Sequence, residues 1–241
     1  MNDFAGKLEN FWNVFLNAGG YREVLKGLQN TLTIAVLGLL IGIVIGTVIA
    51  AVRVLPKYKR LPRVLNSICG FYVGLFRGTP MVVQLLVFYY VLLPLLGVTR
   101  MPSVTVATIV FGLNSGAYIS EIMRSGILSV DSGQMEGGRS VGLSFGTTMI
   151  KIIIPQAVKN ILPTLGNEFI SLIKETSVVS FVGATDLYLA FQRIGSNTYD
   201  FMVPYLVMAV IYIVMVLIIS TLIRIMERRM RKSDHSLQQS K

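Results

Sequence analysis

The sequence predicts an all-α integral membrane protein, and two observations lead to this fold class. First, 53% of the 241 residues are hydrophobic and only 14% are charged, whereas about 25% of residues are charged in a soluble globular domain. Second, the charges are clustered, which leaves long uncharged runs at 27–52, 78–99, 101–120 and 201–223. A helix needs roughly 20 such residues to cross a bilayer. The remaining chain is too short for a separate soluble catalytic domain of about 100 residues.

The first 26 residues are expected to form an extracytoplasmic amphipathic segment. Phe4, Leu8, Phe11, Trp12 and Phe15 recur there at helical spacing. This spacing favours a short helix that lies in the membrane interface. The segment lacks the basic start and the apolar core of a signal peptide.

Residues 27–226 are expected to form the transmembrane domain, which contains five transmembrane helices. The second helix contains Pro80, which breaks or bends it because proline has no backbone N–H group to donate. The fourth begins near Pro155 and is too polar to be recognised by hydropathy alone. The five spans are 27–52, about 64–97, 101 to about 123, from about 155 onward, and 201–223.

The distribution of basic residues predicts the orientation of these spans. Fifteen of the 22 lysines and arginines fall in the segments 53–63, 124–159 and 224–241. Loops rich in lysine and arginine face the cytoplasm. The N-terminus is therefore expected outside, and the basic tail at 227–241 inside. The location that follows is the cell membrane.

Several classes of function are excluded by what the sequence lacks. Cys69 and His235 are the only residues of their types, so a disulfide framework or a Cys/His metal cluster is not expected. The basic residues are not gathered into a patch interleaved with aromatic residues, which argues against nucleic-acid binding. No G-x-S-x-G nucleophile motif occurs.

Two stripes of polar residues are predicted within the membrane. An ionisable side chain at mid-helix costs at least about 2.5–3.5 kcal/mol in lipid, so such residues face a cavity or a partner. The stripes are consistent with a substrate pathway and with plain polar contacts between helices. The third span carries Asn114, Tyr118 and Glu121 on one face; the fourth carries Asn167, Ser171 and Lys174, flanked by Glu168 and Glu175.

A spaced motif lies between the third and fourth spans. Glu136-Gly137-Gly138 is followed after three residues by Gly142, and after nine more by Ile152-Ile153-Ile154-Pro155. This resembles the E-A-A-x3-G-x9-I-x-L-P loop in the membrane subunits of ATP-binding-cassette (ABC) importers. The resemblance implies a cytoplasmic coupling helix, within a loop at about 129–152, that docks on an ATPase subunit. The alternative is an ordinary loop between helices.

The coupling residues implied by this resemblance are Gly133, Gln134, Glu136, Gly137, Gly138 and Gly142. Gly142 is suited to a positive φ at the end of the helix. Gly137 and Gly138 stand where the family usually has alanine, and each costs about 0.5–1 kcal/mol in a helix interior. The coupling helix is therefore expected to be less stable before it docks.

Further motifs narrow the resemblance to the polar amino acid permeases of these importers, over residues 28 to 226. Asp131 stands where that family more often has proline, and the sequence suggests no function for this difference. The motifs are Arg77-Gly78-Thr79-Pro80 with Gln84, Ala117-Tyr118 with Glu121 and Arg124, Gly133-Gln134 before Glu136, Pro155-Gln156-Ala157, and Lys174-Glu175-Thr176-Ser177.

The resemblance implies an ABC type I importer-like permease subunit for polar amino acids. Its implied partners are a second permease subunit, as homodimer or heterodimer, two ATPase subunits, an extracytoplasmic amino-acid-binding protein and membrane lipid. No G-x-x-x-x-G-K-[ST] phosphate loop occurs, so this chain is not expected to be an enzyme or to bind a cofactor. ATP and Mg are expected to bind to the ATPase subunits. The alternative is an oligomeric ion-coupled secondary transporter or channel, which predicts inverted repeats that the sequence does not show.

Substrate contact is expected first at Glu168 and Asn114. Glu168 lies about 13 residues beyond Pro155, or roughly 20 Å into the membrane, and Asn114 reaches a similar depth from the other side. A buried carboxylate would pair with a cationic group of the substrate. The weaker candidates are Gln84, Tyr118, Ser171 and Thr79.

Overall fold

The computed structural model describes residues 2–55 and 60–238, and the side chains of residues 4–55 and 60–230. Helices account for 88% of the structure, and the described residues contain no strand. In chain order the elements are α1 (Asn2–Trp12), η1 (Asn13–Asn17), α2 (Gly20–Val54), α3 (Arg60–Gly78), α4 (Met81–Val87), η2 (Phe88–Leu92), α5 (Leu93–Leu95), α6 (Ser103–Leu128), α7 (Ser132–Ser140), α8 (Phe145–Thr148), η3 (Met149–Ile153), α9 (Ile154–Glu175), η4 (Thr176–Val182), α10 (Leu187–Thr198) and α11 (Met202–Gln238).

Three helices of the described chain are long and apolar enough to cross a membrane by themselves: α2, α6 and α11. Helix α3 and the α4–α5 segment form a fourth, broken element that bends by 107° between Gly78 and Met81. The break predicted at Pro80 is therefore confirmed. Helix α2 begins at Gly20, before the predicted start of the first span, and α11 runs in one piece beyond the predicted end of the fifth. Helix α9, the predicted fourth span, is not among the apolar helices.

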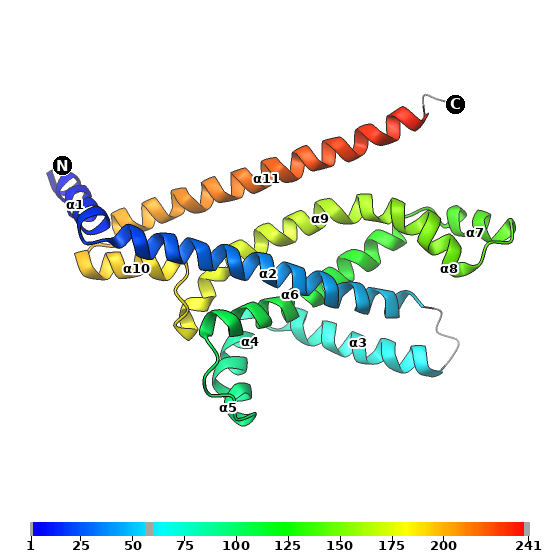
Figure 1. Cartoon of the computed structure of the whole chain (residues 1–241), viewed down its shortest axis with the longest axis horizontal. Helices are drawn as coiled ribbons and strands as arrows, with labels where there is room; N and C mark the ends of the chain where they lie inside the picture. Colours follow the sequence, from blue (N-terminus) through cyan, green and yellow to red (C-terminus); the bar gives the residue numbers. More distant parts are fainter. Residues whose placement is uncertain (1, 56–59, 239–241) are drawn as a thin grey trace.

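The long helices run side by side, and four of the short ones, α1, α7, α8 and α10, lie at the two ends (Figure 1). Helices α7 and α8 lie at the end where α6 finishes and α9 begins, whereas α1 and α10 lie at the opposite end. Helices α4 and α5 turn away from the bundle near its middle. The elbow between α3 and α4 therefore lies at mid-bundle level.

The most extensive helix–helix contact joins α2 to α6. A Cβ atom added at Gly42 would lie 2.8 Å from the Cβ atom of Ser115, and one added at Gly116 would lie 2.9 Å from that of Ile45. Glycines spaced four residues apart let two backbones approach this closely. This contact fixes the orientation of Ser115, which faces the fourth predicted span.

The N-terminal helix is partly buried rather than simply lying in the interface. Phe4 and Trp12 are exposed, as an interfacial helix requires, but only 1% of Phe11 is exposed. Phe11 packs in an apolar cluster with Phe191 and Ile194 of α10. Phe11 therefore contacts the protein, because helical periodicity identifies an apolar face but not the surface that covers it. The position of α1 in the membrane interface stays a prediction.

Candidate functional site

Helix α7 is the short helix predicted from the spaced motif. It begins at Ser132, three residues after α6 ends, and Asp131 is its N-cap residue. The Asp131 carboxylate accepts a hydrogen bond of 2.6 Å from the backbone N–H of Gly133. Asp131 therefore has a structural role that the sequence did not reveal, since an N-cap satisfies a backbone donor at the start of the helix.

The end of α7 is a glycine-terminated cap. Gly142 has φ 84°, as predicted. The backbone N–H of Leu143 donates to the carbonyl of Gly138, and that of Gly142 donates to the carbonyl of Arg139, each at 3.1 Å. This pair of bonds is the Schellman motif, which requires a left-handed residue at the Gly142 position.

The two central glycines of α7 lie in different surroundings. Both lie inside the helix, and a Cβ atom added at Gly137 would meet nothing within 4 Å. One added at Gly138 would lie 2.5 Å from Cγ2 of Thr148, a buried side chain of α8. The departure from alanine at Gly138 thus has a packing reason, because α8 lies against that position.

Helix α7 is tied to α9 near its N-terminal end. The Nε2 group of Gln156 on α9 approaches Oε1 of Gln134 at 3.5 Å. One turn farther along α9, Asn160 donates to Oγ of Ser129 at 2.9 Å, just before α7 begins. The side of α7 that carries Glu136 is exposed. The arrangement is a short helix held by α6 and α9, with one face free to meet a partner.

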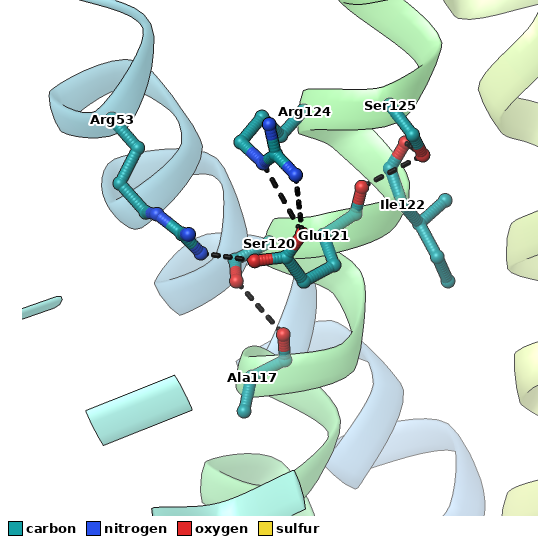
Figure 2. A network of polar contacts seen from close by, with 7 residues as sticks. All are labelled: Arg53, Ala117, Ser120, Glu121, Ile122, Arg124 and Ser125. Atoms are coloured by element: carbon teal, nitrogen blue, oxygen red, sulfur yellow. Dashed lines mark hydrogen bonds and ion pairs between the residues drawn. The ribbon is translucent and has the colours of Figure 1, made fainter. Parts of the chain in front are cut away.

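Figure 2 shows a charged network between α2 and α6. The Glu121 carboxylate pairs with Arg53 of α2 and with Arg124 one turn along α6, the latter at 3.0 Å. Glu121 accepts from both arginines. Glu121 therefore forms a polar contact between helices α2 and α6.

A second network holds the elbow between α3 and α4. Pro80 has no N–H, so the carbonyl of Phe76 loses its helical donor. The Nε2 group of Gln84 replaces it at 2.7 Å and also donates to the Thr79 hydroxyl at 2.9 Å. The Asn114 amide of α6 donates to Oε1 of Gln84 at 2.8 Å. The structure thus joins three predicted site residues, Thr79, Gln84 and Asn114.

The remaining predicted substrate contacts lie around α6 at a similar level. Oγ of Ser115 donates to the half-buried carboxylate of Glu168 on α9 at 3.4 Å. Tyr118 lies under Arg77, whose guanidinium carbon is 5.3 Å from the ring centroid. Ser171 is half-buried one turn beyond Glu168. Glu168 and Asn114 therefore reach neighbouring positions on α6, although no direct contact joins them.

Sequence reasoning missed Ser115 as a contact of Glu168. Serine is too common within membrane helices to be singled out alone. The available signal was the repeat Gly38, Gly42, Gly46 on the first span, which predicts a close helix–helix approach. That repeat does not say which helix approaches, so the pairing with Ser115 needed the tertiary structure.

A broken membrane helix, an exposed short helix between two spans and a polar centre define a transport subunit. The chain belongs to the family of binding-protein-dependent transport system inner membrane components, whose model matches residues 38–232. It is the permease subunit of an ABC importer, as the motifs predicted, and the ATPase activity lies in a separate subunit. Family membership sets aside the alternative of a secondary transporter or channel. The protein is a multi-pass protein of the plasma membrane.

Individual relatives have similar lengths and folds. The arginine transport system permease protein ArtQ of Bacillus subtilis is 36% identical over 88% of this chain and 94% of its own length. The putative glutamine transport system permease protein GlnP of Rickettsia bellii is 37% identical over 86% and 92%. A crystal structure of an amino acid ABC transporter with histidines has a chain that is 39% identical, with TM-score 0.80, over 89% of this chain and 98% of that one.

Proposed function

We propose that this chain carries polar amino acids across the membrane after an extracytoplasmic binding protein delivers them. It works with a second permease subunit and with two ATPase subunits, which bind ATP and Mg. The observation that carries the proposal is α7, a capped helix with an exposed face, held between α6 and α9. The relatives named for arginine and glutamine transport support the substrate class.

Motion reaches the membrane interior through the helices to which α7 is tied. Helix α7 follows α6 directly, and Gln134 and Ser129 contact the first turns of α9. Helix α9 carries Glu168, and α6 carries Ser115, which contacts it. A displacement of α7 by the ATPase subunit would therefore move both helices that contribute to the polar centre. In this proposal Gly133, Gln134, Glu136, Gly137, Gly138 and Gly142 form the coupling element.

The substrate site is proposed around Glu168, with Ser171 and Tyr118 as further contacts. Glu168 holds one weak hydrogen bond, from Ser115, so its carboxylate keeps acceptor capacity for an ammonium group. Asn114 and Gln84 are buried and bonded to each other and to the elbow. We assign these two residues, with Thr79, to shaping the pathway.

The second permease subunit is expected to complete the pathway. No residue in the apolar window of α11 is buried within the described chain. The exposed face of α9 includes Asn167, Lys174 and Glu175, which are too polar for contact with lipid. This face therefore borders the second subunit or the water-filled pathway between the two subunits. We also propose that α7 lies in the cytoplasm and that the N-terminus lies outside, because the basic residues favour that orientation.

The test is reconstitution of the permease, ATPase and binding protein in lipid vesicles. Uptake of L-arginine or L-glutamine should require ATP and should persist without an ion gradient. Glu168→Gln keeps the size of the side chain and should raise the KM for uptake at least tenfold, whereas Glu9→Gln, on the exposed side of α1 and outside the polar centre, serves as the matched control. If Glu168→Gln lowers thermal stability but leaves the KM unchanged, Glu168 only joins helices and the site lies elsewhere.

A further inference from the structure

Arg77 occupies an unusual position for an arginine in a membrane protein. It lies next to the last residue of α3, just before the 107° bend. The side chain is exposed. Arg77 forms no ion pair with residues 4–55 or 60–230, and its guanidinium makes a cation–π contact with the ring of Tyr118. The polar network of the elbow uses Gln84 and Asn114 and leaves Arg77 out.

The exposed side chain of Arg77 lies at a depth within the membrane. Arg77 lies about 14 residues beyond Arg63, or about 21 Å along α3, and Tyr118 lies about 15 Å from the end of α6 at Leu128. Both distances fall well inside a hydrocarbon core of about 30 Å. The guanidinium lies over Tyr118 instead of extending to a membrane surface. An arginine at this depth needs a polar cavity or an anionic partner.

Arg77 and Glu168 both approach one short stretch of α6. Glu168 contacts Ser115 and Arg77 contacts Tyr118, three residues along the same helix. This separation is about 4.5 Å along the helix axis. A positive and a negative group therefore face the same level of the bundle, and neither neutralises the other. Every α-amino acid carries the complementary pair, a carboxylate and an ammonium.

The chemistry of arginine favours the carboxylate as its ligand. A guanidinium presents a planar fork of N–H donors that matches a carboxylate with two parallel hydrogen bonds. An aromatic ring beneath the guanidinium holds its plane through a cation–π contact. Tyr118 provides that ring and is itself 36% exposed. The pair is preorganised for a planar anion.

Lys174 is another cation within the predicted spans, and its surroundings differ. It borders a cavity of about 530 Å³ that is lined mainly by side chains of α11, together with Tyr188 of α10 and Ser177. Glu175 follows it directly in the chain and is close enough to act on it electrostatically. Lys174 therefore has a carboxylate of its own nearby, whereas Arg77 forms no ion pair with any residue whose side chain the structure describes.

We infer that Arg77, held on the ring of Tyr118, binds the α-carboxylate of the amino acid in transit. This inference rests on the proposed function, because it assigns the second charged group of the same substrate. Glu168 then faces the ammonium end. The two groups together select zwitterionic α-amino acids over amines or carboxylic acids that carry one of the charges.

The test measures direct binding to the detergent-purified permease–ATPase complex without the binding protein, so that any discrimination belongs to the permease. The probes are L-arginine and L-glutamine, each compared with its α-carboxamide, which lacks only the negative charge. The wild-type complex should bind the amino acid at least tenfold more tightly than the amide. Arg77→Gln should bring this ratio close to one while the affinity for the amide stays the same. Lys174→Gln, the matched control, should keep the wild-type ratio.

Two further variants keep the result decisive if Arg77→Gln does not assemble with the ATPase. Tyr118→Phe retains the ring and should keep the ratio, whereas Tyr118→Leu removes the platform and should lower it at least threefold. Equal ratios in the wild type, Arg77→Gln and Tyr118→Leu would overturn the role of Arg77, as would a wild-type complex that does not distinguish acid from amide. ATP-driven uptake of the amino acid by wild-type vesicles tests the proposed function separately, so loss of that uptake is a distinct failure.

Discussion

Adjacent glycines in the coupling helix should respond in opposite ways to the same substitution. Gly137 and Gly138 both lie inside α7. Gly137→Ala places a methyl group in open space, whereas Gly138→Ala places it 2.5 Å from Cγ2 and 2.9 Å from Oγ1 of Thr148. Thr148 is fully buried and cannot move aside freely. The two variants differ only in what the added methyl group meets.

The magnitudes follow from helix propensity and packing. Alanine is favoured over glycine by about 0.5–1 kcal/mol in a helix interior, so Gly137→Ala should stabilise α7 by that amount. Gly138→Ala has the same gain, but overpacking costs about 1–3 kcal/mol. The net effect at Gly138 is therefore a loss of up to about 2.5 kcal/mol.

Amide hydrogen exchange across α7, measured on the assembled complex, reports these changes as local opening. Gly137→Ala should slow exchange about two- to fivefold, and Gly138→Ala should accelerate it. Thr148→Ala removes both atoms that the new methyl group meets, so the double variant with Gly138→Ala should recover protection. If the two glycine variants change exchange in the same direction, the contact between α7 and α8 does not have the packing described above.

Three other perturbations test the coupling element, the charged network and the orientation. Gly142→Val forces a β-branched residue into the left-handed region and should abolish stimulation of ATP hydrolysis by loaded binding protein. Gly142→Asn should keep most of this stimulation, because asparagine tolerates the left-handed region. Equal activity of both variants would show that the turn is unimportant. Glu121→Gln should destabilise the purified complex by about 1–3 kcal/mol in thermal unfolding, because Arg53 loses its charged acceptor, and an unchanged midpoint would contradict this. A cysteine at Tyr199 in a Cys69→Ala background should react with an impermeant thiol reagent in intact cells and one at Ser140 should not; the reverse pattern would invert the orientation.

The sequence alone determined the class of this protein and much of its local structure. Long uncharged runs identify a membrane protein, because lipid excludes charge. The break at Pro80 follows from its missing N–H, and the positive φ of Gly142 follows from its lack of a Cβ atom. These features depend on covalent chemistry and on neighbours in the chain, so they can be derived before any tertiary contact is known.

Only the tertiary structure decided which polar groups are already occupied. Asn114 appears in the sequence as a candidate for substrate contact, but the fold places it against Gln84, which replaces the hydrogen bond lost at Pro80. Gly138 is a departure from alanine in the sequence and a packing requirement beside Thr148 in the fold. The guanidinium of Arg77 lies over the ring of Tyr118, which is far from it in the chain, so its orientation could not be predicted from the sequence. The physical reason is common to all three: the free energy of a polar or close-packed group depends on the neighbours that the fold brings to it, and those neighbours are distant in sequence.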